Sequence, residues 1–333
     1  MWFKQLTGFE EQNPEQVRQQ LWLDGGALVS RVTGRTMVLG RLELPTLSEL
    51  RERVIEARPP AGALRLREVV ADVQQLHTDP DNAGALFQVA SQFNLLEMVS
   101  PRMTPEHGVD IYEYDATQGP ACAIAAGAGT IYRNYFVPCG DQLGQSVDQQ
   151  IDCAAELGER LGNGDGQLWK TINGYLLPTR EGLERIGATL GDMLDVELNE
   201  LRGLLRIGLQ WNTQVTLDDA VHCVTQAYCS ATPVAYSEHD DELWRPLAQL
   251  VLESAYEATC WAALLPERAG PSRQLFLTLL GGGAFGNRAE WILHAIRRAL
   301  KLVAAAGYGL EVAIVSYGGS RPEVAALASE FTG

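Results

Sequence analysis

The sequence contains no run of 18 consecutive apolar residues, and its first segment, MWFKQLTGFEEQNPEQ, has no basic region followed by an apolar one. These absences argue against a membrane-spanning helix and against a secretory signal peptide. The six cysteines form no Cys-x-x-Cys pair, and the five histidines lack the spacing of zinc ligands. We therefore expect a cytoplasmic protein with reduced thiols and no metal site.

Basic side chains are scarce as well. The 26 Lys and Arg residues face 42 Asp and Glu residues, which gives a formal charge of -16. A field of that sign repels phosphate backbones and anionic lipids, so we expect neither nucleic acid nor a membrane as a partner. A small anionic ligand is not excluded, because backbone N–H groups can bind phosphate without Lys or Arg. The hydrophobic share of 46% is typical of a globular protein with a core.

Short apolar segments alternate with amphipathic stretches along the chain. Strand-like patterns occupy residues 64–72, 85–91, 204–216, 221–231, 274–280 and 310–318. Helical spacing of apolar residues connects them, so we predict the α/β class, with a mixed or parallel central sheet covered by helices on both faces. We expect one domain at 61–333 with a mostly helical insertion at about 141–205, and an N-terminal extension at 1–60 that packs on the core.

A glycine-rich turn lies between the apolar segment QLFLTLL and the helical segment RAEWILHAI. Adjacent glycines let a ligand approach the backbone, and successive N–H groups at the start of a helix bind phosphate. The turn lacks the GK[ST] ending of a P-loop and the ribose-binding acid of a dinucleotide fingerprint. Its candidate ligand-binding residues are Gly281, Gly282, Gly283, Ala284, Phe285, Gly286 and Asn287. Phe285 either stacks on a ribose or base or, if the turn is purely structural, plugs the core.

A second loop of small residues, DATQGPACAIAAGAG, also precedes a helical segment. Two such strand-loop-helix elements that face each other over strand ends hold a nucleotide diphosphate in open α/β sheets. The candidate ligand-binding residues here are Gln118, Gly119, Pro120, Ala121, Cys122 and Ala123. Close packing of the helix on the sheet is the alternative explanation, since Ala and Gly favour that too. Cys122 is better explained as a small packing residue than as a nucleophile.

Four segments together resemble the macrodomain family of ADP-ribose-binding proteins. EVVADVQQLHTDPDNAGALFQVAS is similar to the family's opening strands, TQGPACAIAAGAG and LLGGGAFGN to its two phosphate loops, and VAIVSYG to its final strand. The resemblance covers about residues 64–135 and 205–318 and implies a three-layer fold with ADP-ribose as ligand and no cofactor. It places Asp72 where the family's aspartate accepts a hydrogen bond from the adenine amino group. Gln92 falls near the ribose-proximal Asn of the family, which this chain replaces.

The departures from the family pattern refine this expectation. The usual VNAANS and GGGV signatures are absent, and so is the paired-glutamate signature of poly(ADP-ribose) glycohydrolases. The blocks ASQFNLLE, TQGPACAIAAG and LGGGAFGN are most similar to the branch that contains the bacterial effector MavL, which removes ADP-ribose from arginine. That resemblance implies an ADP-ribosyl hydrolase whose partner is an ADP-ribosylated protein. A reader that binds ADP-ribose without catalysis and a NAD-consuming or nucleotide-sugar enzyme are the alternatives.

Hydrolysis of an ADP-ribosyl bond needs a carboxylate that directs water at the anomeric carbon of the distal ribose. Asp115 stands immediately before the second loop and is our first candidate for the base, with Asp110 the second. Both are ordinary solvated carboxylates on the competing interpretation. Asn94 and Glu97 are candidates for hydrogen bonds to ribose, or alternatively form a capping box at the start of a helix.

Overall fold

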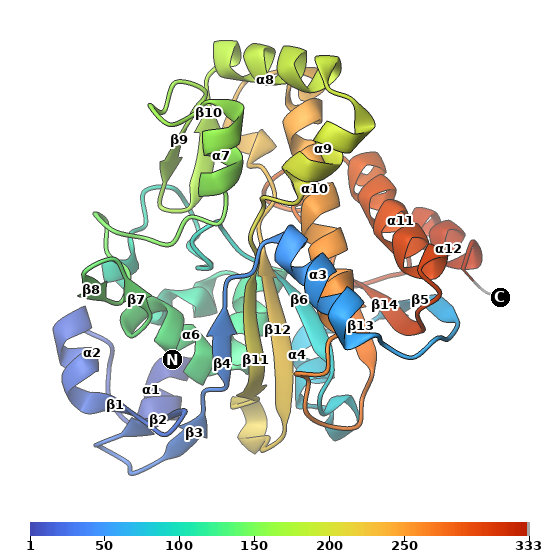
Figure 1. Ribbon diagram of the computed structural model, residues 1–333. Coiled ribbons are helices and arrows are strands. Elements are labelled where there is room, and N and C mark those ends of the chain that lie inside the picture. Colours follow the sequence, from blue (N-terminus) through green and yellow to red (C-terminus); the bar gives the residue numbers. More distant parts are fainter. Residues whose placement is uncertain (332–333) are drawn as a thin grey trace.

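A seven-stranded mixed sheet forms the centre of the molecule in the computed structural model, which describes residues 1–331 (Figure 1). The strands lie in the order β4 (Arg41–Glu43), β11 (Gly208–Gln214), β12 (Cys223–Cys229), β6 (Leu86–Ala90), β13 (Gln274–Leu277), β14 (Leu310–Ser316) and β5 (Leu64–Val70). From β12 to β5 the strands are parallel, whereas β11 is antiparallel to both of its neighbours. The predicted α/β class with a mixed sheet is confirmed.

The central strands are buried on both faces. Every residue of β6 except Ala90 is buried, and so is every residue of β12 except Cys223. Strand β5 lies at an edge, and within it only Leu66 is buried. Continuous apolar runs therefore mark the inner strands, because helices cover both faces of a parallel sheet.

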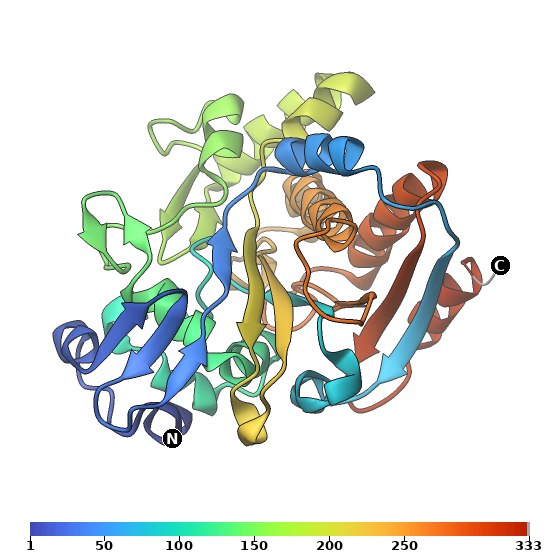
Figure 2. The same ribbon diagram turned by 60° about the horizontal axis from the view of Figure 1, so that its bottom comes forward.

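Helices lie on both faces of the sheet (Figure 2). One layer contains α3 (Leu47–Ala57), α10 (Asp241–Ala263) and α11 (Ala289–Ala305). The other elements around the sheet are α4 (Val73–Thr78), α5 (Gln118–Ala125), α6 (Gly127–Tyr135) and α12 (Pro322–Ser329). Helix α5 packs on β6 and α4, α6 packs on β11, and α12 packs on β5. Within residues 1–331, no helix is long and apolar enough to cross a membrane.

The N-terminal 60 residues supply one edge of the large sheet, since β4 pairs with β11. The preceding elements are α1 (Trp2–Thr7), α2 (Pro14–Gln20), β1 (Leu21–Asp24), β2 (Ala27–Ser30) and β3 (Thr36–Val38), of which the three strands form a small sheet. A second apolar cluster, which includes Phe3, Leu28 and Ile131, joins these elements to α6. The first helix is thereby fixed beside the loops that precede α5.

The segment 141–205 is less helical than predicted. It contains α7 (Ala155–Leu161), α8 (Arg180–Asp192) and α9 (Asp195–Arg202), and also a hairpin of β9 (Trp169–Ile172) and β10 (Tyr175–Pro178). A second small hairpin pairs β7 (Pro138–Cys139) with β8 (Gln142–Leu143). The β9–β10 hairpin turns at Asn173 and Gly174, which both have positive φ. Asn-Gly is the dipeptide that two-residue hairpin turns favour, so the signal for this hairpin was present in the sequence.

Short 3₁₀ helices occupy several loops. They are η1 (Pro80–Asn82), η2 (Pro105–His107), η3 (Asp110–Tyr114), η4 (Leu217–Asp219) and η5 (Val234–Tyr236). Two of them border the carboxyl edge of the sheet, because η3 packs on α5 and η5 follows the residues after β12. The segment between β6 and α5 thus contains two short 3₁₀ helices, η2 and η3.

A buried histidine makes the stability of this core depend on pH. His77 lies beside Phe87 at 3.8 Å between ring centroids, its Nδ1 is 2.7 Å from the Val73 carbonyl, and its Nε2 is 3.1 Å from Nε2 of Gln226. With Nδ1 as the donor, Nε2 accepts from Gln226 only when the ring is neutral. Burial lowers the pKa of His77 from 6.5 to about 4, because the charged ring would lose its hydration.

We expect His77 to destabilise the fold as pH falls from 6.5 towards 4. In that window the unfolded chain binds a proton at this histidine and the folded protein does not, so the free energy of unfolding decreases by about 3 kcal/mol. Urea unfolding of the wild type and of His77→Gln at several pH values measures the difference. A pH dependence that is the same in both proteins would contradict the prediction.

Candidate functional site

A cleft of about 690 Å³ lies at the carboxyl ends of β5, β6, β13 and β14. The loops that leave parallel strands at one edge enclose such a space, which is where open α/β sheets bind ligands. The candidates from the sequence that line it are Asp72, Gln92, Glu97, Asp115, Gln118, Gly119, Pro120, Ala121, Gly281, Gly282, Gly283, Ala284, Phe285 and Asn287. In the described part of the chain, the other candidates lie outside the lining: Asn94, Asp110, Cys122, Ala123 and Gly286.

The glycine loop after β13 is held in shape by its own backbone. Asn287 donates from Nδ2 to the Thr232 carbonyl at 2.8 Å, and its N–H donates to the Gly281 carbonyl at 2.9 Å. Gly281 has φ of 73° and would place a side chain on Ala231 and Asn287, so only glycine fits there. Gly283 differs, because a Cβ added to it would meet no atom within 4 Å. The tip of the loop is therefore open to the cleft, with the N-terminus of α11 beside it.

Phe285 packs against the edge of the main core and also belongs to an aromatic cluster. Its ring centroid is 5.4 Å from that of Tyr175 and 5.7 Å from that of Tyr236. All three rings line the cleft, and the hydroxyl of Tyr175 donates to the Met98 carbonyl at 2.6 Å. Tyr175 comes from β10, so the insertion contributes to the wall of the cleft. The sequence predicted that Phe285 either contacts a ligand or fills the core, but it gave no sign of the two neighbouring tyrosines.

The second loop extends the hydrogen bonding of β6 through a side chain. The amide of Gln118 accepts from the Ala90 N–H at 2.9 Å and donates to the Gln88 carbonyl at 2.8 Å, as a neighbouring strand would. The same Nε2 is 3.1 Å from Sγ of Cys122. Burial raises the pKa of the Cys122 thiol well above its usual value, which agrees with a packing residue. Gln118 thus fixes the start of α5 at the end of β6.

The loop after β6 is braced by the insertion. Asn94 is fully buried, donates to Oε1 of Gln150 at 2.8 Å and accepts from the Leu96 N–H. Gln150 in turn donates to the side chain of Asn173 in the hairpin turn, and the Phe93 N–H donates to the Gly174 carbonyl at 3.0 Å. Asn94 therefore supports the loop from its buried side and lies outside the lining of the cleft. The capping-box alternative fails, since no helix begins there.

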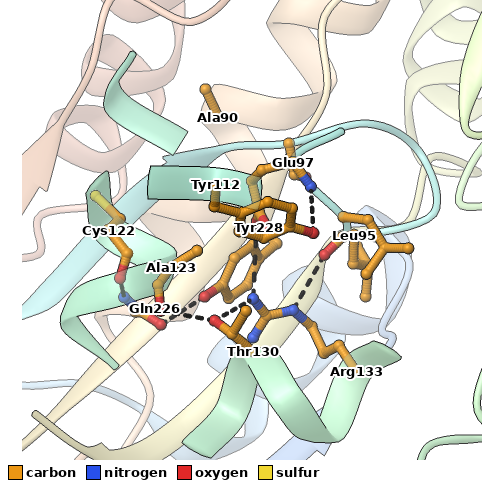
Figure 3. Close-up of polar contacts among 12 residues, drawn as sticks. Ala90, Leu95, Glu97, Tyr112, Cys122, Ala123, Thr130, Arg133, Gln226 and Tyr228 are labelled. Atoms are coloured by element: carbon orange, nitrogen blue, oxygen red, sulfur yellow. Dashed lines mark hydrogen bonds and ion pairs between the residues drawn. The ribbon is translucent and has the colours of Figure 1, made fainter. Parts of the chain in front are cut away.

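Glu97 is the most unusual side chain of the cleft (Figure 3). It is 2% exposed, and neither carboxylate oxygen has a hydrogen-bond partner within residues 1–331. Its backbone N–H donates to the hydroxyl of Tyr112 at 3.0 Å, and Oε1 lies 3.7 Å from Nη2 of Arg133. Burial raises the pKa of Glu97 to about 8, although Arg133 and Tyr112 act in the opposite direction.

The two aspartates that we predicted as catalytic residues lie in different places, and only one of them lines the cleft. Asp115 lines the cleft, and its Oδ1 accepts from the Thr117 N–H at 2.9 Å, just before α5 begins. Asp110 lies outside the cleft lining and is 6% exposed, with its carboxylate next to the backbone N–H of Phe3 in α1. Its own N–H donates to the side chain of Glu11 at 2.7 Å. Asp110 thus anchors the N-terminal helix, and no catalytic role is carried forward for it.

The opposite end of the cleft follows β14 and β5. Asp72 lies there as the N-cap of α4, where its Oδ1 accepts from the Gln74 N–H at 2.7 Å. The exposed Tyr317 follows β14, and Arg321 is the one basic residue that lines the cleft in the described chain. Because the strand order is β6, β13, β14, β5, the cleft has carboxylates at one end, the glycine loop in the middle and Asp72 at the other end.

Several residues that line the cleft are not among the candidates from the sequence. They are Trp2, Glu113, Tyr175, Tyr236, Tyr317 and Arg321. Trp2 belongs to α1, and its backbone N–H donates to the carboxylate of Glu113 at 2.9 Å. The motif SYG at the end of β14 could have indicated Tyr317, because it follows a buried strand. Among residues 1–331 no group of three or more His, Cys, Asp or Glu side chains is arranged to hold a metal ion.

Comparison with known proteins gives only distant similarity. No family model matches the chain, and no curated protein matches it in sequence. The poly(ADP-ribose) glycohydrolase from Deinococcus radiodurans, in complex with ADP-ribose, is 13% identical with a TM-score of 0.46, over 87% of this chain and 91% of that one. The poly(ADP-ribose) glycohydrolase from Thermomonospora curvata is 13% identical with a TM-score of 0.45, over 95% of each chain. These structures do not support the MavL-type branch that the motifs resemble.

Proposed function

We propose that the cleft binds ADP-ribose and that the protein hydrolyses an ADP-ribosyl linkage. The observation that carries the proposal is the order of groups along the sheet edge. The glycine loop and the N-terminus of α11 at its centre suit a diphosphate, since backbone N–H groups and a helix dipole attract anions. Asp72 at one end offers an acceptor for an adenine amino group. The carboxylates at the other end lie where the distal ribose would be placed.

The proposed reaction is attack of water at C1 of the distal ribose. Asp115 is the candidate base, because it lines the cleft directly before the loop that would contact that ribose. Nearby negative charge also favours an oxocarbenium-like transition state. Asp115 and Glu113 together give this end of the cleft negative charge, which suits a substrate that carries a cationic guanidinium. We therefore propose ADP-ribosylated arginine as the substrate, acted on without a cofactor.

Calorimetric titration of ADP-ribose into the purified protein tests the binding part of the proposal. We expect a micromolar dissociation constant, and no heat at millimolar ligand would overturn the assignment. Release of ADP-ribose from arginine-, glutamate- and serine-linked peptides then tests catalysis and linkage. Binding without release from any of the three would leave a reader as the function. Release of nicotinamide from NAD would instead indicate a NAD-consuming enzyme.

A further inference from the structure

The buried carboxyl of Glu97 makes one long ion-pair contact, in which its Oε1 lies 3.7 Å from Nη2 of Arg133. Its backbone N–H donates to the hydroxyl of Tyr112, which also lies close enough to the carboxyl to lower its pKa. Neither carboxylate oxygen has a hydrogen bond of good geometry within the described residues. A buried carboxyl without a good hydrogen bond costs stability, and the ion pair with Arg133 is too long to offset that cost fully. The side chain nevertheless lines the cleft beside Gly119, whose Cβ, if present, would lie 3.2 Å from Cγ of Glu97.

We infer that Glu97 donates the proton that the leaving group needs when the ADP-ribosyl bond breaks, and that Arg133 positions Glu97 from below the cleft. This inference rests on the proposed function. It assigns the two carboxyl groups different tasks: Asp115 acts on water, and Glu97 acts on the leaving atom. Arg133 is a positioning residue, because it is fully buried and does not line the cleft in the described structure.

Arg133 is fixed by contacts that leave it turned towards Glu97 (Figure 3). Its Nε donates to the Leu95 carbonyl at 3.0 Å, and its Nη2 donates to the Thr130 hydroxyl at 3.1 Å. The guanidinium lies over the ring of Tyr228, 3.5 Å from the centroid. A cation held this firmly limits the movement of the neighbouring carboxyl without forming a short ion pair with it, since the closest N–O distance is 3.7 Å.

The proposed step balances without any further reagent. The bond between C1 of the distal ribose and the leaving atom breaks, the electron pair goes to the leaving atom, and that atom takes the proton of Glu97. Water adds to C1 and transfers one proton to Asp115. Glu97 then regains a proton from solvent while Asp115 releases one. The net reaction consumes one water and yields ADP-ribose and the free side chain.

Burial prepares Glu97 for this task at neutral pH. Its pKa of about 8 means that the carboxyl is protonated at pH 7, as a proton donor must be. Removal of the Arg133 charge raises that pKa further, because the cation favours the ionised form. The raised pKa of Glu97, and its further rise when the Arg133 charge is removed, can each be measured separately from the rate of hydrolysis.

The decisive test compares Glu97→Gln on two substrates. On whichever arginine- or serine-linked peptide the wild type cleaves, we expect the variant to lose about 100-fold in rate. On ADP-ribose that carries 4-nitrophenol at C1 of the distal ribose, we expect a loss below about threefold, because this leaving group departs without a proton. Binding of ADP-ribose stays unchanged. Glu159→Gln, an exposed glutamate on α7, is the matched control and retains full activity.

Two further measurements separate chemistry from folding. In the pH profile of kcat/KM, we expect Arg133→Met to move the fall at alkaline pH to a pH about one unit higher. Arg133→Lys returns that fall to the pH seen for the wild type. Glu97→Gln has a higher Tm than the wild type at pH 8, and the difference shrinks at pH 5, because above 4.5 folding forces the wild-type carboxyl to take up a proton.

The outcomes distinguish this inference from the proposed function. A wild type that cleaves neither kind of substrate overturns both. A wild type that is active, with a Glu97→Gln variant that loses equally on the peptide and on the nitrophenyl substrate, overturns the proton-donor role alone. Full activity of Glu97→Gln on the peptide overturns it as well.

Discussion

Gly283→Glu is expected to weaken ADP-ribose binding about 1000-fold in calorimetric titration. The glycine is exposed at the tip of the loop after β13, and a Cβ there meets no atom within 4 Å. The new side chain therefore enters the cleft without a clash that would unfold the loop. Its charge is placed where the diphosphate would lie, and repulsion between like charges costs several kcal/mol.

Gly164→Glu is the matched control for that variant. Gly164 is also exposed, and a Cβ added to it also meets no atom within 4 Å, but it lies in the turn between α7 and β9. Both variants add the same charge to the chain, so a difference between them comes from position alone. We expect Gly164→Glu to bind ADP-ribose as the wild type does. If Gly283→Glu binds within threefold of the wild type, the glycine loop does not hold the diphosphate.

Asp115→Asn is expected to lower the rate of hydrolysis by about 1000-fold while ADP-ribose still binds. The substitution keeps Oδ1, which accepts from the Thr117 N–H, so the turn that begins α5 is preserved. It removes the charge and the basicity that activation of water requires. Single-turnover release of ADP-ribose from the modified peptide measures the loss, and calorimetry with ADP-ribose confirms that the site is intact.

Asp165 provides a control with the same local geometry. Its Oδ1 accepts from the Gln167 N–H at 3.2 Å, in the same two-residue arrangement, on an exposed loop that does not line the cleft of the described structure. Asp165→Asn should therefore leave both binding and hydrolysis unchanged. Full hydrolysis by Asp115→Asn would show that another group activates the water.

The large sheet could be predicted from the sequence because its inner strands are continuous apolar runs. The segment QLFLTLL and the final strand were found in this way, and so was the glycine loop that joins the first of them to a helix. The order of the strands could not be read, since β5 and β6 are adjacent in sequence but separated by β14 and β13 in the sheet. That separation gives the cleft its length.

The polar residues of the site were harder to assign than the loops. Asn94, Glu97 and Asp110 lie close together in the sequence, and residue type suggested one shared site. All three are buried in the structure, but each has different neighbours. Asn94 bonds to the insertion, Asp110 lies next to α1, and of the three only Glu97 lines the cleft. Such differences depend on tertiary contacts with distant segments, which a single sequence does not reveal.

The β9–β10 hairpin limits how this chain can be shortened or recombined. Gly174 has φ of 75°, and a Cβ there would lie 2.5 Å from the side chain of Asn94, so the turn and the loop after β6 fit together only with glycine at this position. The same hairpin supplies Tyr175 to the cleft. Excision of 141–205 to obtain a smaller crystallisation target would therefore open one wall and release the loop that carries Glu97. A chimera that borrows this insertion must borrow the loop after β6 with it.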